Sequence, residues 1–150
     1  MKIISWIYIV FILFIVLLAC HVKDEDFELC GIGILKPYYV TGLDNHGEIY
    51  AIEQAFNKNY VPPTDNNTGI VKIRFQVNCH GDTGNFQYES YNLEYEKMDL
   101  NDSIEIQIRK ITRGLDEWIP GRNDAGENVN SFKFLSFRLD NGIITEILPK

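Results

Sequence analysis

Residues 69–78 carry the most regular alternation of apolar and polar side chains in the chain. This two-residue period is typical of a β-strand with one buried and one solvated face. The buried positions would be Val71, Ile73, Phe75 and Val77. A glycine-containing turn over residues 79–84 leads to a second alternating segment, residues 85–91. The pattern therefore predicts a β-hairpin that contributes Phe75 to the core.

Two segments show the spacing of three to four residues that is typical of amphipathic helices. The first covers about residues 48–58, and Asn45 precedes it as a candidate N-cap. The second starts after Asn101, another candidate cap. Its apolar positions are Ile104, Ile108, Ile111 and Leu115. We therefore expect one helix before the hairpin and one after it.

Trp118 and Pro120 follow the second helix. An indole ring of this size is best buried, so Trp118 is expected to fill part of the core. Pro120 and the glycine after it would direct the chain into a turn toward the last strands. Together with Phe75, Trp118 and Pro120 are the predicted structural core.

The C-terminal part of the chain predicts two more strands. In residues 129–139 the apolar positions change parity near Phe134, which indicates either a β-bulge there or a strand covered on both faces. Asn141 and Gly142 are typical of a tight hairpin turn, after which residues 143–148 would return as the last strand. The whole order predicts an α+β domain with two helices packed on one face of a small antiparallel sheet and an added C-terminal hairpin strand.

The N-terminal end has the layout of a targeting segment. Residues 3–19 contain no charged side chain and follow Lys2, as in a secretory signal. The segment Leu17-Leu18-Ala19-Cys20 resembles the lipobox of bacterial lipoproteins, which implies cleavage before Cys20 and acylation of its thiol. The alternative is an uncleaved membrane helix, because a run of 17 uncharged residues is close to the minimum that spans a bilayer.

We therefore divide the chain into a signal peptide (1–19), a lipidated acidic tether (20–28) and a single domain (29–150). The predicted location is the envelope of a Gram-negative cell, as a membrane-anchored lipoprotein that faces the periplasm or lies at the outer membrane. The net charge is −7, and it becomes −8 without residues 1–19 because Lys2 is lost. With no basic cluster in the sequence, this charge excludes a polybasic membrane patch and predicts no binding of nucleic acid.

Cys30 and Cys79 remain as thiols once Cys20 is acylated. Outside the cytoplasm they could be bonded to each other, or they could be two independent small buried residues. His80 follows Cys79, but no set of ligands has the spacing of a zinc site, so we expect no metal and no cofactor. Adjacent residues on a turn usually point apart, which argues against a Cys79–His80 nucleophile, and we expect no enzymatic activity.

Three segments occur in the order found in one known family: residues 69–81, residues 118–122 with the sequence Trp-Ile-Pro-Gly-Arg, and residues 126–129 with the sequence Gly-Glu-Asn-Val. Over about residues 49–139 the chain resembles the C-terminal domain of the TonB energy transducer. This resemblance implies that the last strand accepts an extended peptide from an outer-membrane receptor. The partner-binding residues would be Val129, Ser131, Lys133, Leu135 and Phe137.

The chain also departs from that family. Its tether is short and lacks a proline-rich spacer, and the strand at 143–148 could cover the edge that family members leave open. The first hypothesis is a non-enzymatic envelope lipoprotein that recognises a peptide or protein partner through a sheet edge, linked to TonB-type transport. The alternative is a structural or assembly lipoprotein with a capped sheet edge and no transport role. The sequence makes no prediction of the oligomeric state.

Overall fold

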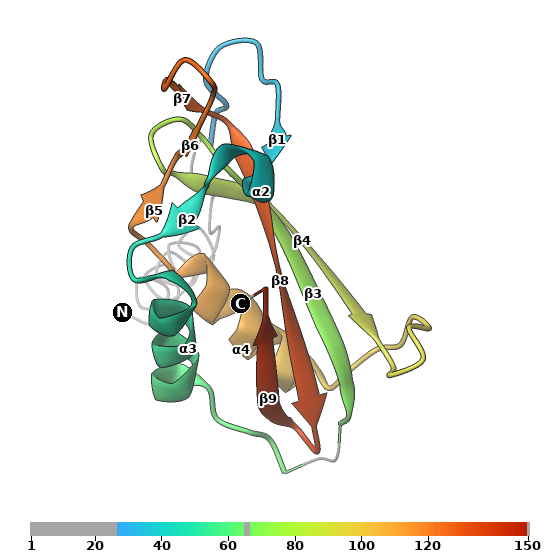
Figure 1. Ribbon diagram of the computed structural model, residues 1–150. Coiled ribbons are helices and arrows are strands. Elements are labelled where there is room, and N and C mark those ends of the chain that lie inside the picture. Colours follow the sequence, from blue (N-terminus) through green and yellow to red (C-terminus); the bar gives the residue numbers. More distant parts are fainter. Residues whose placement is uncertain (1–26, 65–66, 150) are drawn as a thin grey trace, which may run out of the picture.

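The computed structural model describes residues 27–64 and 67–149 (Figure 1). The predicted signal peptide, Cys20 and most of the predicted tether therefore lie outside the described residues. Over the described residues the fold is α+β, with a mixed five-stranded sheet, two small two-stranded sheets and three helices. The predicted fold class is confirmed at this level.

The five-stranded sheet is built around one long strand. Its members are β1 (Lys36–Pro37), β3 (Gly69–Val77), β4 (Thr83–Tyr91), β8 (Ser131–Asp140) and β9 (Ile143–Leu148). The strand β8 pairs with β3 along one edge and with both β1 and β9 along the other (Figure 1). The β1–β8 pair is parallel, so the expectation of a purely antiparallel sheet is wrong. A strand of two residues has no alternation from which it could have been predicted.

Two small sheets involve residues 118–129, which precede β8. In the first, β2 (Asp44–Asn45) pairs with β5 (Trp118–Ile119). In the second, β6 (Gly121–Arg122) pairs with β7 (Asn128–Val129). Gly121 is required where the chain turns between them, because a Cβ there would overlap the hydroxyls of Thr41 and Ser131, which lie 2.9 Å from each other.

The three helices are α2 (Tyr38–Thr41), α3 (Glu48–Asn59) and α4 (Asp102–Arg113). Both predicted helices are confirmed, and the Asn101 side chain caps α4 by accepting a hydrogen bond of 2.8 Å from the Ser103 amide. The prediction of Asn45 as the cap of α3 is wrong, because Gly47 occupies that position. The Asn45 side chain instead donates a hydrogen bond to the Asp116 carbonyl and so joins the two chain segments of the β2–β5 sheet.

Helices α3 and α4 share one hydrophobic core with one face of the sheet. Phe56 of α3 lies against Phe137 of β8, with ring centroids 4.6 Å apart. Phe75 is fully buried, stacks on Phe86 at 5.2 Å and meets the edge of Trp118 at 5.0 Å. The core positions predicted for Phe75 and Trp118 are therefore confirmed. Pro120 is half-buried in the link between β5 and β6.

The register of β8 against β3 runs without interruption from Ser131, opposite Val77, to Leu139, opposite Gly69. Of the two alternatives predicted from the change of parity, the bulge near Phe134 is therefore wrong. The irregularity lies instead between Arg138 and Leu139, in the pairing with β9. The apolar positions change parity in the sequence without a bulge because a polar residue, Lys133, lies on the core face. The apolar Phe134 lies on the opposite face and is 41% exposed.

Candidate protein-binding surface

The strand that was expected to receive a partner is the most enclosed strand of the sheet. On the edge of β8 away from β3, β1 covers residues 131–132 and β9 covers residues 136–140. Among the described residues, this leaves only 133–135 of that edge without a paired strand. Four of the five predicted binding side chains, Ser131, Lys133, Leu135 and Phe137, are buried, and Val129 is half-buried in β7. Binding through this strand stays a prediction, and the geometry gives a partner little access to it.

The predicted covering of β8 by the C-terminal strand is confirmed. Asn141 and Gly142 form the turn, with φ angles of 50° and 78°. This left-handed conformation is the one that asparagine and glycine adopt most easily, and it brings β9 back alongside β8. The Gly142 amide also donates to the Asn67 carbonyl at 2.7 Å, which fixes the turn against the segment before β3.

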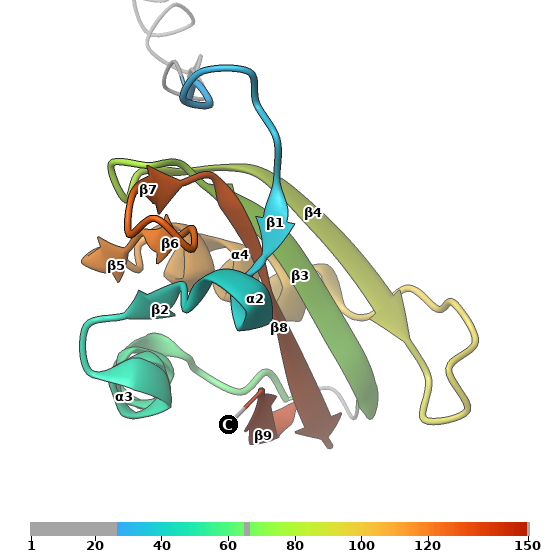
Figure 2. The same cartoon turned by 45° about the horizontal axis from the view of Figure 1, so that its top comes forward.

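A free sheet edge is present elsewhere, on β4. This strand of nine residues pairs with β3 on one side, and Figure 2 shows it as the outermost strand of the sheet. On its other side the described residues form only an isolated bridge between Tyr91 and Lys97, together with a hydrogen bond of 3.2 Å from the Met98 amide to the Ser90 carbonyl. Residues 83–89 of this edge have no paired strand among the described residues, and their N–H and C=O groups can pair with a further strand except at a bulge, where Asn85, with a φ of 51°, and Phe86 lie opposite Phe75.

Helix α4 lies under β4 in a matched ladder of three contacts. Glu105 accepts a hydrogen bond from the Ser90 hydroxyl at 2.5 Å. Arg109 lies 4.3 Å from the Tyr88 ring centroid, and Arg113 lies 5.4 Å from that of Phe86. Four residues of helix rise by about 6 Å and two residues of strand by about 6.7 Å, so each helix position meets the next β4 residue on that face. The ladder brings two arginines to the helix side of the free edge.

The sheet face opposite the helices forms a shallow groove of about 1110 Å³. It is lined by residues of β3, β4, β8 and β9, among them Lys72, Arg74, Gln87, Phe132, Phe134 and Leu148. Lys72 Nζ lies 4.9 Å from the ring centroid of Tyr91 and 5.0 Å from that of Tyr95. The Arg74 guanidinium lies 4.2 Å from the Phe132 ring centroid. Aromatic rings hold both cations at this face.

Glu89 is the acidic residue of β4, and its carboxylate is hydrogen-bonded to two neighbouring side chains. It accepts hydrogen bonds from the Tyr91 hydroxyl at 2.8 Å and from Lys97 Nζ at 3.0 Å. These bonds lower the pKa of Glu89, and the bond to Glu89 raises the pKa of Tyr91. At neutral pH this carboxylate is therefore ionised and partnered at the surface of the edge strand.

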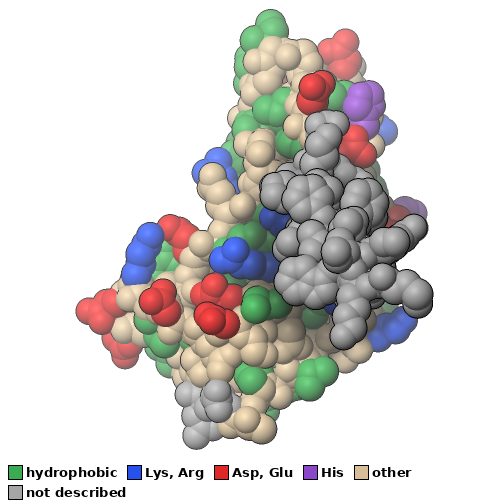
Figure 3. All heavy atoms as spheres, turned by 180° about the vertical axis from the view of Figure 1, so that it is seen from behind, with side chains coloured by type: hydrophobic (Ala, Val, Ile, Leu, Met, Phe, Trp, Pro, Cys, Tyr) green, Lys and Arg blue, Asp and Glu red, His purple; other side chains and the backbone are tan. Residues whose placement is uncertain are grey.

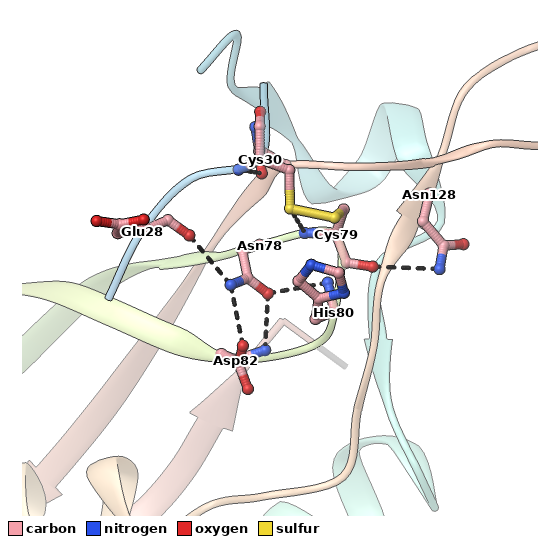
Figure 4. The surroundings of a disulfide bond; sticks show 8 residues. Glu28, Cys30, Asn78, Cys79, His80, Asp82 and Asn128 are labelled. Carbon is pink, nitrogen blue, oxygen red and sulfur yellow. Dashed lines mark hydrogen bonds between the residues drawn. A yellow bond between two sulfur atoms is a disulfide. The ribbon is translucent and has the colours of Figure 1, made fainter. Parts of the chain in front are cut away.

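A disulfide links Cys30 to Cys79 and fastens the N-terminal segment to the β3–β4 turn (Figure 4). Of the two alternatives that the sequence left open, the bonded pair is confirmed. The Asn78 carbonyl oxygen of the side chain accepts from the amides of His80 and Asp82 at 2.9 and 3.0 Å, which shapes the turn. The Asn130 side chain accepts a hydrogen bond of 2.9 Å from the Cys30 amide and donates one of 2.8 Å to the Cys30 carbonyl. These two bonds satisfy the backbone groups of Cys30 in the way that a paired strand would.

This bond also decides what chemistry the cysteines can perform. Ligand atoms of Cys30, Cys79 and His80 lie within 4.8 Å of one another. Metal ligation and nucleophilic attack both require a thiolate, and in the disulfide the two sulfur atoms are bonded to each other. In this form Cys79 and His80 therefore do not constitute a nucleophile with its base.

The tether enters the domain at the beginning of β4. The Phe27 ring lies against Gly84 so closely that a Cβ at that glycine would overlap it. Glu28 follows and accepts a hydrogen bond of 3.1 Å at its carbonyl from the Asn78 side chain. The first described residues are therefore fixed to the disulfide end of the sheet.

Comparisons of this chain with protein-family models, curated proteins and solved structures found no match. The resemblance to the TonB C-terminal domain thus rests on the order of its motif residues and stays a prediction. In the described part of the chain, no helix combines the length and apolarity that crossing a bilayer requires. The disulfide is typical of proteins that fold outside the cytoplasm.

Proposed function

We propose that this protein is a lipid-anchored, non-enzymatic module of a bacterial envelope that binds an extended segment of a partner protein by strand addition to β4. The observation that carries this proposal is the contrast between the two long strands. The outer edge of β4 has no strand partner over residues 83–89 among the described residues, whereas β8 is paired on both sides. A strand addition needs an accessible row of backbone groups, and β4 offers one.

The attachment of the tether supports this proposal. Phe27 is the seventh residue after Cys20, a distance of at most about 25 Å in a fully extended chain. Phe27 lies at Gly84, at the start of β4. An acylated Cys20 would therefore keep the β4 edge within reach of protein segments that leave the membrane surface.

The proposed relation to TonB-type transport depends on the resemblance described above. If it holds, the partner is an extended segment of an outer-membrane receptor. The binding edge would then be β4 at one side of the sheet instead of the last strand, because β9 covers β8. The shared fold class is compatible with this relation, but a fold alone does not assign a partner.

Photocrosslinking in intact cells tests the proposal. A photoreactive residue replaces Gln87, which is exposed on β4, and the matched control replaces Gln54, which is exposed on α3. We expect capture of a defined envelope protein from position 87 and none from position 54. Failure to capture any protein from position 87, or the same capture from both positions, would overturn strand addition to β4.

The second candidate function is a structural or assembly lipoprotein without a transport role. It is favoured by the β8–β9 pairing, because the edge that the TonB family leaves open is covered here. Such a protein would bind through its acidic surface, to which Glu48 and Glu53 of α3 belong. Capture from position 54 and none from position 87 would support this alternative.

A further inference from the structure

The disulfide end of the sheet brings together three side chains of the types that bind metal ions. Ligand atoms of Cys30, Cys79 and His80 all lie within 4.8 Å of one another. Adjacent residues of a turn usually point apart, but Figure 4 shows the His80 ring beside the disulfide. The sequence predicts no metal site, because Cys30 and Cys79 are 49 residues apart and no ligands have the spacing of a zinc motif. The fold therefore assembles a cluster that the spacing does not reveal.

The three ligand atoms fit a tetrahedral zinc site once the sulfur atoms are released from each other. Zinc binds thiolate sulfur at about 2.3 Å and imidazole nitrogen at about 2.0–2.1 Å, so its ligand atoms lie about 3.5–3.8 Å apart. An imidazole nitrogen within 4.8 Å of both sulfur atoms needs a movement of only about 1 Å to reach this separation. His80 is exposed, so its ring can rotate and a water molecule can be the fourth ligand.

Both cysteines are positioned by contacts that do not depend on the disulfide. The Asn130 side chain bonds the amide and the carbonyl of Cys30, at 2.9 and 2.8 Å. The Asn128 side chain donates to the Cys79 carbonyl at 3.2 Å. The Cys79 amide donates to the Cys30 sulfur at 3.2 Å, the kind of contact that orients a thiolate ligand of a metal. Reduction breaks only the bond between the sulfur atoms, so these contacts keep the two thiols facing each other.

A reductant can reach this disulfide from the solvent. Cys30 and Cys79 are both half-buried, and His80 beside them is exposed. Figure 3 shows histidine side chains, in purple, at the surface of the molecule. Thiol–disulfide exchange requires that a thiolate approach one of the two sulfur atoms, and this position allows it.

We propose that reduction of the disulfide converts this end of the sheet into a zinc site, with the thiolates of Cys30 and Cys79 and the His80 ring as ligands. A dithiol supplies two electrons and two protons, which leaves two protein thiols and converts the dithiol into a disulfide. Zn²⁺ then displaces one proton from each thiol. The ion replaces the covalent bond as the link between the N-terminal segment and the β3–β4 turn. This inference does not depend on strand addition to β4.

A cobalt titration of the full chain in detergent tests this inference, because Co²⁺ can replace zinc and its thiolate complexes absorb visible light. The chain is reduced with a dithiol, which is then removed in the absence of oxygen. We expect the reduced chain to bind one equivalent of Co²⁺ with the charge-transfer absorption of thiolate ligands, and Zn²⁺ to displace it. The oxidised chain should not develop this absorption, because it has no thiolate at this site.

Matched variants identify the ligands. Cys30→Ser/Cys79→Ser should lose the absorption, and because it keeps Cys20 it also accounts for any binding by that residue. Changes around a metal ligand cost about 10–100-fold in affinity, so loss of a ligand in His80→Ala should weaken Co²⁺ binding by at least about tenfold. His46→Ala is the control, because His46 is also exposed but lies outside the cluster, and it should bind as the parent does.

Urea denaturation separates a native zinc site from metal binding by the unfolded chain. An ion that binds the folded state more tightly raises the denaturation midpoint. We expect Zn²⁺ to raise the midpoint of the reduced chain and to leave those of the oxidised chain and of Cys30→Ser/Cys79→Ser unchanged. If reduction unfolds the chain, as circular dichroism would show, Zn²⁺ should restore the native spectrum.

The results that would overturn the zinc site are equally specific. They are no thiolate absorption from Co²⁺ in the reduced chain, equal binding by His80→Ala and the parent, or no effect of Zn²⁺ on the midpoint or the spectrum of the reduced chain. None of these results bears on the crosslink from position 87, so the two proposals succeed or fail separately.

Discussion

The Lys133 ammonium lies 3.4 Å from the Asp44 carboxylate, and this pair ties the middle of β8 to β2. Lys133 is 7% exposed, and its Nζ also lies 5.0 Å from the Tyr38 ring centroid and 5.7 Å from that of Trp118. Lys133, which the sequence predicted as a partner-binding residue, is therefore part of the interior. Its long apolar stem fills the space under the two rings.

Removal of Asp44 should lower the free energy of unfolding more than removal of the Lys133 charge. We expect Asp44→Asn to lower the free energy of unfolding by about 1–3 kcal/mol, because it leaves an enclosed ammonium without its counterion. Lys133→Met should cost less, because methionine keeps the apolar stem. Urea denaturation of both single variants and the double variant measures the coupling.

The exposed pair Lys97–Glu89 is the matched control for this experiment. Its atoms lie 3.0 Å apart, but the two side chains are 74% and 49% exposed. Its coupling should therefore be weaker than that of Lys133–Asp44. A coupling for Lys133–Asp44 no larger than that of the exposed pair would show that burial does not strengthen it.

The contact between Gly84 and Phe27 can be tested by a double-mutant cycle. A Cβ at Gly84 would overlap the Phe27 ring, so we expect Gly84→Ala to lower the free energy of unfolding by about 1–3 kcal/mol. In a Phe27→Ala background the same change should cost much less, because the ring is gone. Gly114→Ala is the control, since the nearest atom to its added Cβ is 3.4 Å away. An equal cost of Gly84→Ala in both backgrounds would contradict the packing of the Phe27 ring against Gly84.

The long elements could be predicted from the sequence because their periods extend over many residues. The pattern after Asn101 gave α4 and its cap, and the alternation from Gly69 gave β3. The strand β1 has two residues and is held by tertiary contacts, such as the hydrogen bond of 3.3 Å from the Lys36 amide to the Asn130 carbonyl. Such a segment has no local signal.

The candidate binding surface could not be predicted for a related reason. Which edge of a sheet is free depends on strand order, and β8 pairs with β3 at a sequence separation of more than 50 residues. The position of Arg109 and Arg113 beside β4 depends in turn on how α4 packs. The sequence showed their four-residue spacing, but it did not show which strand they would face.

Alkaline pH should destabilise the protein partly through Tyr60. Burial raises the pKa of this tyrosine to about 12, and its hydroxyl donates a hydrogen bond of 2.7 Å to the Gly142 carbonyl. Above pH 10 the unfolded state releases this proton, whereas the folded state keeps it until about pH 12. The unfolded state is thus favoured progressively as the pH rises through this window.

The comparison with Tyr60→Phe isolates this effect from the other groups that titrate at high pH. The variant loses the hydrogen bond to Gly142 and should be less stable at neutral pH by about 1 kcal/mol. We expect the difference from the parent protein to shrink between pH 10 and 12, as measured by urea denaturation at each pH. A difference that stays constant over this range would show that Tyr60 ionises equally in both states.

The disulfide should supply a large part of the stability of the N-terminal attachment. It joins residues 49 positions apart in the sequence, and the chain-entropy relation gives about 4 kcal/mol for closing a loop of that length. We expect Cys30→Ser/Cys79→Ser to lower the free energy of unfolding by about that amount in urea titrations. The parent protein in reductant should behave like the variant, and reductant should not affect the variant further. Retention of the parent's stability in the variant would mean that the Asn130–Cys30 and Phe27–Gly84 contacts already hold this segment without the covalent bond.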